Sequence, residues 1–203
     1  MSSRNTLRKN LRQQRRTLTT AQQHRYSEKI ARHICHSHLF RSAQHIACYL
    51  ANDGEINLKP IIQRIWRMGK QCYLPLLSEG RDKRMWFAPY TANTPLKLNT
   101  YGIPEPLSHP GQWIAPQQLD LVLMPLVGFD STGNRLGMGG GYYDHSFAFL
   151  NRSFGIKKPR LLGAAYELQR CDKLPTEAWD VPLSAIATER GLYAFPNGRE
   201  PTS

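Results

Sequence analysis

Residues 128–144 are the part of this sequence best equipped for chemistry. They read GFDSTGNRLGMGGGYYD, and four glycines stand directly before an expected helix: Gly137, Gly139, Gly140 and Gly141. Glycine lets the backbone take positive φ angles or approach a ligand closely, and the unpaired N–H groups at a helix start attract phosphate. Arg135 adds a planar cation just upstream. The stretch is neither a Walker A motif nor GxGxxG. It predicts an anion-binding loop, with a hairpin that binds no ligand as the alternative.

Two acidic residues could complete such a site. Asp144 falls in the first turn of the expected helix, where an acid can simply complement the helix dipole. Its other interpretation is a magnesium ligand, because Mg²⁺ is typically held by one or two carboxylates together with phosphate oxygens of the substrate. Asp180, in the sequence WDVP, is a candidate second carboxylate, and an ordinary turn residue is the equal alternative for it.

Alternating strands and helices must position these residues. We expect helices over residues 6–17, from residue 20 onward, 58–68 and 142–151, and strands over residues 45–50, 71–74, 85–88, 120–125, 161–165 and 185–188. Residues 89–118 are rich in Pro, Gly, Asn and Thr, which predicts irregular connections. This order predicts a single α/β domain over residues 1–203, with a largely parallel open sheet and helices on both faces, a Rossmann-like three-layer arrangement. Ligands bind beyond the carboxyl ends of such strands, here residues 52–55 and 128–141.

Basic charge is concentrated at the start of the chain. The sequence has 27 Lys and Arg against 15 Asp and Glu, a net charge of +12, and residues 1–41 hold ten of these cations and one acid, Glu28. A nucleic-acid-binding arm, a mitochondrial transit peptide and a solvated helix face beside an anionic small-molecule site would each account for that charge. Leu7, Leu11 and Leu18 recur at spacings of four and seven, which indicates a helix docked on the core and favours the third interpretation.

The composition excludes several classes of protein. The longest apolar run, residues 121–127, is interrupted by Pro125 and is far shorter than the ~20 residues of a membrane helix. The first ten residues lack the apolar segment of a secretory signal. The cysteines are scattered without a CxxC pair, which excludes a zinc ribbon or a disulfide scaffold and indicates free thiols in a reducing compartment: Cys35, Cys48, Cys72 and Cys171.

The glycine-rich stretch resembles the hallmark of one family, the 5-formyltetrahydrofolate cyclo-ligases, also called 5,10-methenyltetrahydrofolate synthetases. The matching pattern is GFD-x-x-GNRLG-x-G-x-GYYD, and further matches are Arg4-x-x-x-Arg8, residues 50–55, 101–106 and 179–182, and Thr188-Glu189. The resemblance therefore spans nearly the whole chain. It implies ATP-dependent closure of 5-formyltetrahydrofolate to 5,10-methenyltetrahydrofolate with release of ADP and phosphate, in which ATP phosphorylates the formyl oxygen and N10 of the folate then attacks.

The resemblance also implies roles for individual residues. It assigns ATP to Arg4, Arg8, Arg135, Leu136, Gly137, Met138, Gly139, Gly140, Gly141, Tyr142 and Tyr143. It assigns the folate to Leu50, Glu55, Tyr101, Met138 and Tyr142, and magnesium to Asp144 and Asp180. Arg135 and Tyr143 are the expected catalytic residues. The family usually has Lys where this chain has Arg4 and often Arg where it has Met138. The phosphate site here should therefore depend more on backbone N–H groups, Arg135 and Mg²⁺.

These implications define an expected enzyme and its alternatives. We expect ATP as co-substrate, Mg²⁺ as cofactor, and a cytoplasmic monomer that acts on small molecules, namely ATP and a reduced folate that can carry a polyglutamate tail. No membrane partner is expected. Two alternatives stay open: an RNA-binding protein, which the charge of residues 1–41 motivates, and another nucleotide-dependent ligase or kinase on the same fold.

Overall fold

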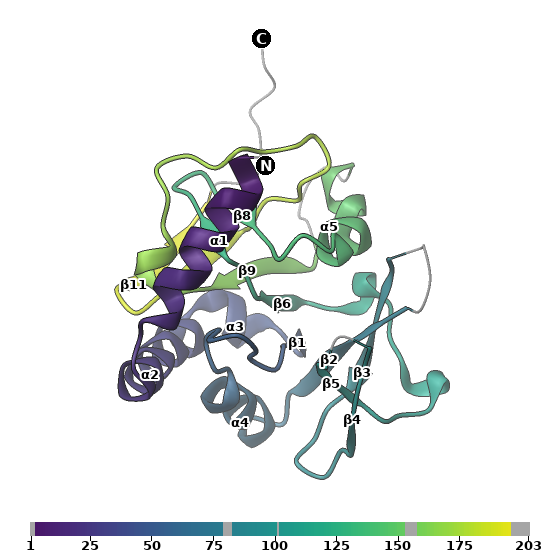
Figure 1. The fold of residues 1–203 in the computed structure, drawn as a ribbon. Helices are drawn as coiled ribbons and strands as arrows, with labels where there is room; N and C mark the ends of the chain where they lie inside the picture. The colour runs from purple at the N-terminus through teal and green to yellow at the C-terminus, as the bar shows by residue number, and fades with distance from the viewer. Residues whose placement is uncertain (1–2, 79–82, 101, 153–157, 196–203) are drawn as a thin grey trace.

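A seven-stranded sheet forms the centre of the computed structural model, which describes residues 3–78, 83–100, 102–152 and 158–195. From edge to edge its strands are β11 (Gly191–Ala194), β10 (Ala185–Thr188), β9 (Arg160–Ala164), β6 (Leu121–Met124), β1 (His45–Ala47), β2 (Gln71–Leu77) and β3 (Met85–Pro89). The five inner strands pair in parallel, and the edge strands β11 and β3 are antiparallel to their neighbours. The predicted α/β fold with a largely parallel open sheet is therefore confirmed (Figure 1).

Helices cover both faces of this sheet. One face carries α2 (Thr20–His36), α3 (His38–Ser42) and α4 (Lys59–Arg67), and the other carries α5 (Tyr142–Phe147) with the short 3₁₀ helix η3 (Ala148–Asn151). Successive residues of β6 show the two faces, because side chains alternate along a strand. Leu121 and Leu123 pack with Ile61 of α4, whereas Val122 packs with Phe147 of α5. These two apolar layers hold the strands, and hence their carboxyl ends, in place.

The basic helix α1 (Ser3–Arg16) packs on a small hairpin of β7 (Gly128–Phe129) and β8 (Arg135–Leu136). Leu7 and Leu11 join Val127 and Leu136 in one apolar cluster, so the predicted core-facing stripe of this helix is confirmed. A Cβ atom at Gly128 would come within 2.6 Å of the Leu11 side chain, and glycine is therefore what lets the helix lie this close. Figure 1 shows α1 crossing the molecule near the loops that follow the strands.

The next helix begins where the sequence predicts. Thr19 is its N-cap and accepts the Gln22 N–H, and the Gln22 side-chain oxygen accepts the Thr19 N–H at 2.8 Å, so the predicted capping box is confirmed. The short helix α3 and the edge strand β11 were not predicted. Within the described ranges, no helix combines the length and the apolar character that crossing a bilayer requires.

Residues 89–118 contain more regular structure than their composition predicts. β4 (Leu96–Leu98) and β5 (Pro104–Pro106) form an antiparallel pair, and two 3₁₀ turns follow, η1 (Pro110–Gln112) and η2 (Pro116–Gln118). The prediction of irregular connections is wrong for this hairpin. Proline lacks the N–H of a sheet ladder and is tolerated in short edge strands, so its abundance hid both strands from the sequence pattern.

Three predicted elements differ from the structure near the expected site. The strand predicted over residues 45–50 ends at Ala47, and the helix predicted over 142–151 is α for six residues before it continues as η3. The glycine-rich loop begins with the β7–β8 hairpin. Asp130 holds the turn of that hairpin, because its carboxylate accepts hydrogen bonds from the backbone N–H groups of Thr132 and Asn134 at 3.0 and 3.1 Å.

Candidate active site

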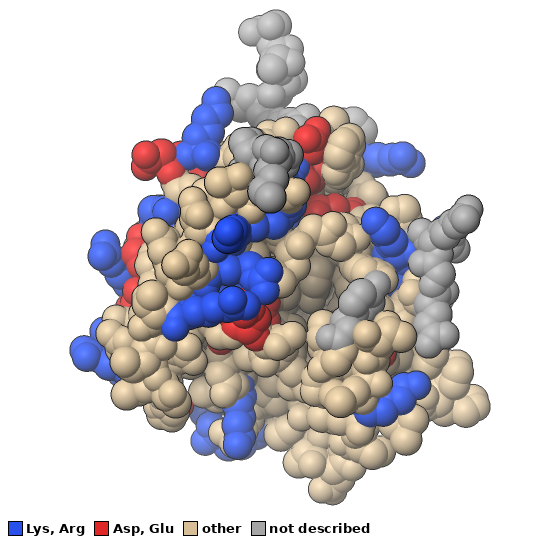
Figure 2. Space-filling model, viewed as in Figure 1, with Lys and Arg blue, Asp and Glu red and all other residues tan. Residues whose placement is uncertain are grey.

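A cavity of about 680 Å³ opens beyond the carboxyl ends of three parallel strands. Tyr49 and Leu50 follow β1, Leu77 ends β2, and Pro125 follows β6, and all four line the cavity. The rest of the wall comes from α1, the segment after β8, the β4–β5 hairpin and residues 177–180. Figure 2 shows a hollow in the surface beside a cluster of Lys and Arg side chains. Both loops that the sequence placed after strands contribute residues to this cavity.

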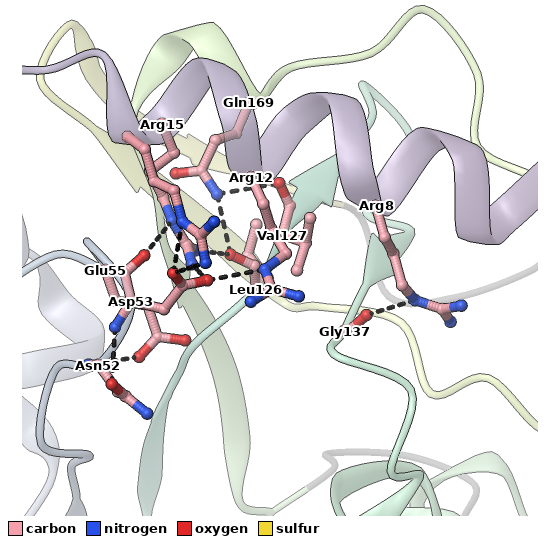
Figure 3. Close-up of polar contacts among 11 residues, drawn as sticks. Arg8, Arg12, Arg15, Asn52, Asp53, Glu55, Leu126, Val127, Gly137 and Gln169 are labelled. Carbon is pink, nitrogen blue, oxygen red and sulfur yellow. Dashed lines mark hydrogen bonds and ion pairs between the residues drawn. The ribbon is translucent and has the colours of Figure 1, made fainter.

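Two arginines of α1 reach the cavity wall. Arg4 donates from its two terminal nitrogens to the Asp180 carboxylate at 3.2 and 3.4 Å. Arg8 donates from Nε to the carbonyl oxygen of Gly137 at 2.8 Å (Figure 3). Burial lowers the pKa of Arg8, and the nearby charge of Arg4 lowers it further. The start of α1 therefore presents two guanidinium groups to the glycine-rich segment, an arrangement that favours an anionic ligand between them.

A third arginine, Arg135, enters the cavity from β8. Its Nη2 atom donates to Asp144 Oδ1 at 2.6 Å, and the same oxygen accepts the backbone N–H of Val181 at 3.1 Å. This second bond ties Asp144 to the residue directly after Asp180, so two carboxylates far apart in sequence meet at one wall. The Nε atom of Arg135 is buried without a hydrogen-bond partner among the described residues. Gly141, with φ of 77°, makes the turn that leads into α5.

The second half of α1 holds the loop after β1. The Asp53 carboxylate accepts hydrogen bonds from Arg12 Nε at 2.7 Å, from Arg16 Nε at 2.7 Å and from Arg15 Nη2 at 3.1 Å. Arg15 is fully buried and also donates to two carbonyl oxygens, those of Asp53 at 3.0 Å and Leu126 at 3.3 Å. Figure 3 shows Arg12 and Arg15 converging from the helix on Asp53. Arg15 thus joins α1 to the segments that follow both β1 and β6.

Glu55 lies in the same loop and faces the cavity. The backbone N–H of Asn52 donates to Glu55 Oε2 at 3.1 Å, and the N–H of Glu55 returns a bond to the Asn52 carbonyl at 3.0 Å. Burial raises the pKa of the Glu55 carboxyl, although the Asn52 bond lowers it in part. The loop therefore fixes this side chain in a tight turn whose geometry depends on Asp53 at its centre.

Two tyrosines, Tyr49 and Tyr143, line the cavity together with Glu55. Burial raises the pKa of Tyr49 and of Tyr143, and the negative charge of Glu55 raises both further. The Tyr49 hydroxyl has no hydrogen-bond partner among the described residues. Both groups consequently keep their protons at neutral pH, and each remains an O–H donor.

Most of the predicted site residues line this one cavity: Arg4, Arg8, Leu50, Glu55, Arg135, Gly137, Met138, Gly139, Gly140, Gly141, Tyr142, Tyr143, Asp144 and Asp180. Leu136 is not brought to the site. It neighbours Arg135 on β8, and because side chains alternate along a strand it points into the apolar cluster beneath α1. Tyr101 lies outside the described residues.

Sequence reasoning missed several residues of the cavity wall. Tyr49, Glu105 and Trp179 line it, and none was predicted to contact a ligand. Glu105 and Trp179 stand in stretches that matched the family pattern, residues 101–106 and 179–182. The match could have marked both residues, but it was not used to give either of them a role. Tyr49 was hidden inside a predicted buried strand, which ends at Ala47 and leaves Tyr49 beyond the sheet edge.

Comparisons with known proteins span nearly the whole chain. A family model described as the 5-formyltetrahydrofolate cyclo-ligase family matches residues 1–189. The chain is 40% identical to the 5-formyltetrahydrofolate cyclo-ligase of Haemophilus influenzae, over 89% of this chain and 94% of that one. It is 35% identical to the enzyme of the same name from Escherichia coli, over 91% of this chain and 100% of that one.

A solved structure gives the same picture at the level of the fold. The structure of 5,10-methenyltetrahydrofolate synthetase from Aquifex aeolicus matches with a TM-score of 0.80 and 29% identity, over 98% of this chain and 96% of that one. The synthetase from Mycoplasma pneumoniae matches with a TM-score of 0.71 and 25% identity, over 92% and 99%. Sequence and fold therefore point to the same set of relatives.

Proposed function

This chain belongs to the 5-formyltetrahydrofolate cyclo-ligase family, and we infer that it closes 5-formyltetrahydrofolate to 5,10-methenyltetrahydrofolate in an ATP-dependent ligation. The observation that carries this inference is the composition of the single cavity described above. Arg4, Arg8 and Arg135 supply cations for a triphosphate, while Glu55 and Tyr143 supply polar groups for a heterocycle. The same cavity therefore offers cations to the nucleotide and hydrogen-bonding groups to the folate.

The triphosphate of ATP fits between α1 and the segment after β8. Phosphate oxygens only accept hydrogen bonds, and the planar forks of Arg8 and Arg135 donate in pairs. Met138, which is exposed on the cavity wall, contributes no charge to this segment. The arginines and the backbone N–H groups around Gly139 and Gly141 are thus the groups we assign to the phosphates.

The carboxylates at this wall suit a magnesium ion bound with the nucleotide. Both hydrogen bonds of Asp144 with described residues end on Oδ1, and one of them comes from Val181, the residue next to Asp180. Mg²⁺ commonly takes one or two protein carboxylates and completes its shell with water and phosphate oxygens, so Asp144 and Asp180 are a sufficient protein contribution. When bound, the ion would neutralise charge on the phosphate oxygens.

The reaction requires two bond exchanges. The formyl oxygen attacks the terminal phosphorus of ATP, and the bond to ADP breaks. N10 of the folate then bonds to the formyl carbon, that carbon releases its oxygen within inorganic phosphate, and N10 loses its proton. Such transfers depend mainly on positioning and on stabilising charge. Arg135 is the group we assign to the charge on the transferred phosphoryl, because its guanidinium is buried beside the proposed phosphate position.

Tyr143 and Glu55 act on the folate. The protonated Tyr143 hydroxyl can donate a hydrogen bond to the formyl oxygen or to its phosphorylated form. Glu55 can accept hydrogen bonds from pterin nitrogens through the carboxyl oxygen that Asn52 does not occupy. Both groups therefore hold the folate with its formyl carbon near N10.

The direct test is to incubate the protein with 5-formyltetrahydrofolate, ATP and Mg²⁺ and to follow the absorbance of the methenyl product. Product that forms only when ATP is present, with one ADP released per turnover, supports the function. Absence of product under these conditions overturns it, and ATP hydrolysis on a different acceptor would favour the other ligase or kinase class.

Asp144→Asn tests the magnesium assignment. We expect kcat/KM to fall by at least about a hundredfold, and Mg²⁺ to lose its effect on the binding of a non-hydrolysable ATP analogue, while the protein stays folded. Asp172→Asn is the matched control, because Asp172 is exposed and lies outside the cavity. Analogue binding by Asp144→Asn that still depends on Mg²⁺ as in the wild type would remove Asp144 from the metal site.

We assign the enzyme to the cytoplasm as a monomer. The four cysteines are free thiols, which suits a reducing compartment. A monomer elutes at 23.2 kDa by size-exclusion chromatography with light scattering. Affinities measured for folates with one and with several glutamates would show whether a polyglutamate tail adds to binding.

A further inference from the structure

Glu105 is a second acid at the carboxyl ends of the central strands. It lies on β5, it is 7% exposed, and it lines the cavity. The backbone N–H of Leu77, the last residue of β2, donates to Glu105 Oε1 at 3.0 Å, and Asn99 Nδ2 donates to the same oxygen at 2.9 Å. These bonds fix the β4–β5 hairpin to the end of β2 and present the Glu105 carboxyl to the cavity.

The contacts of this carboxyl group are one-sided. Both hydrogen bonds end on Oε1, and Oε2 makes none with any residue that the structure describes. No described Lys, Arg or His forms a salt bridge with Glu105. Oε2 is not fully buried, and Glu105 lines the cavity. The second oxygen is therefore suited to a hydrogen-bond donor that arrives with a ligand.

Glu105 lines the same cavity as Glu55, the acid already assigned to the folate. Glu55 stands in the loop after β1, and Glu105 is bound to the end of β2. These strands are parallel neighbours, with Ile46 opposite Cys72, so both acids stand beyond the carboxyl ends of adjacent strands. In each acid, one carboxyl oxygen accepts a backbone N–H and the other is left for a ligand in the cavity.

We propose that Glu105 is a further substrate-binding residue, whose Oε2 accepts a hydrogen bond from the 2-amino group or N3–H on the pyrimidine edge of the reduced folate. This inference rests on the proposed function. That edge of a pterin carries adjacent N–H donors, and a carboxylate oxygen is a strong acceptor for them. Glu105 thereby selects ligands with donors at this edge, while the arginines select the nucleotide.

Glu105→Gln separates ligand binding from the anchoring of the hairpin. The amide oxygen can keep the bonds from Leu77 and Asn99, and the NH₂ group then takes the place of Oε2, so that a donor faces the donors of the folate. We expect the KM for 5-formyltetrahydrofolate, and its dissociation constant without ATP, to rise about tenfold or more. The KM for ATP and the melting temperature should change little. Glu28→Gln, on the exposed face of α2, is the matched control.

An unchanged folate dissociation constant in folded Glu105→Gln overturns the proposal, as does an equal loss of folate and ATP affinity. If this variant does not fold, the wild type is titrated with a folate analogue in which methyl groups replace the 2-amino group and the N3 proton. Equal affinity for the analogue overturns the proposal, and weaker affinity supports it. A wild type that binds folate but forms no product contradicts the proposed function, and Glu105 is then judged by binding alone.

Discussion

The two halves of α1 carry the same kind of side chain and use it differently. In the first half, Arg4 and Arg8 line the cavity. In the second half, three arginines converge on the carboxylate of Asp53: Arg12, Arg15 and Arg16. Spacings of three and four residues place Arg4, Arg8, Arg12 and Arg15 along one face of the helix, and Arg16 lies one turn after Arg12. One stripe of cations therefore serves a ligand site at its start and a structural junction at its end.

The difference shows that the net charge of a segment says little about what the charge binds. A single carboxylate, Asp53, engages three of the cations of residues 1–41, and Asp180 engages Arg4. Four of the ten cations that motivated an RNA-binding alternative are thus engaged in ion pairs within the chain. Position along the helix decides which arginine faces the cavity, and the predictions below test that division.

Replacing Arg15 should have the largest effect. Arg15→Met removes donors from the carbonyl oxygens of Asp53 and Leu126 and an ion pair from Asp53, in a buried position. We expect the free energy of unfolding to fall by about 3 kcal/mol, measured by urea denaturation. An unfolding free energy within about 0.5 kcal/mol of the wild type would show that the junction is not structural.

Asp53→Asn should have the next largest effect, and the effect should depend on pH. Burial alone would raise the pKa of Asp53, but hydrogen bonds from Arg12 and Arg16 outweigh this and lower it. Asparagine tolerates the φ of 50° at this position, so the change removes charge without adding strain. We expect a loss of about 2 kcal/mol at neutral pH.

The sign of the pH dependence follows from the lowered pKa. The folded carboxylate holds a proton less tightly than the unfolded one, so its contribution to stability is present above about pH 4 and is lost as the pH falls further. Denaturation curves for the wild type and Asp53→Asn should therefore converge below pH 4. A difference that stays constant down to pH 2 would contradict the role of this charge.

Arg8→Met should weaken the binding of ATP and leave the stability of the fold nearly unchanged. Removal of one cation from the proposed phosphate position should raise the KM for ATP about tenfold, while the free energy of unfolding changes by less than about 1 kcal/mol. Lys9→Met is the matched control, because Lys9 carries the same charge on the exposed side of the same helix. Equal effects of the two variants on the KM for ATP would mean that Arg8 acts only through the overall positive charge of α1 and not through direct contact with the phosphates.

Arg16→Met should have the smallest effect. The Arg16 side chain is 59% exposed, whereas that of Arg15 is 1% exposed, although both bind Asp53. Exposed ion pairs contribute about 0–1 kcal/mol and weaken in salt. We expect a loss below 1 kcal/mol that decreases further in 0.5 M NaCl. A loss as large as that of Arg15→Met would show that the number of bonds to Asp53 matters more than burial.

Local pattern was enough to predict much of the fold and part of the site. Buried runs such as residues 121–124 alternate with amphipathic helices, and the structure confirms the parallel sheet that this order predicts. Glycines before Tyr142, with Arg135 and Asp144 on either side, marked the segment that now lines the cavity. These residues could be recognised from sequence alone because backbone freedom and charge are properties of single residues.

Contacts between distant segments were beyond that pattern. Glu105 reaches the cavity on the β4–β5 hairpin, which the sequence pattern did not predict because the segment is rich in proline. Asp144 is linked to the segment of Asp180 only by the hydrogen bond from Val181. The buried Arg15 could not be told from the exposed Arg16 by residue type.

The sequence by itself determined the order of strands and helices, the apolar stripe that docks α1, and the glycine-rich segment before α5. Tertiary structure alone decided which charge meets which partner. Periodicity acts over a few neighbouring residues, whereas the energy of a charge depends on the distance to its partner and on the water between them. Those two quantities exist only once the chain has folded.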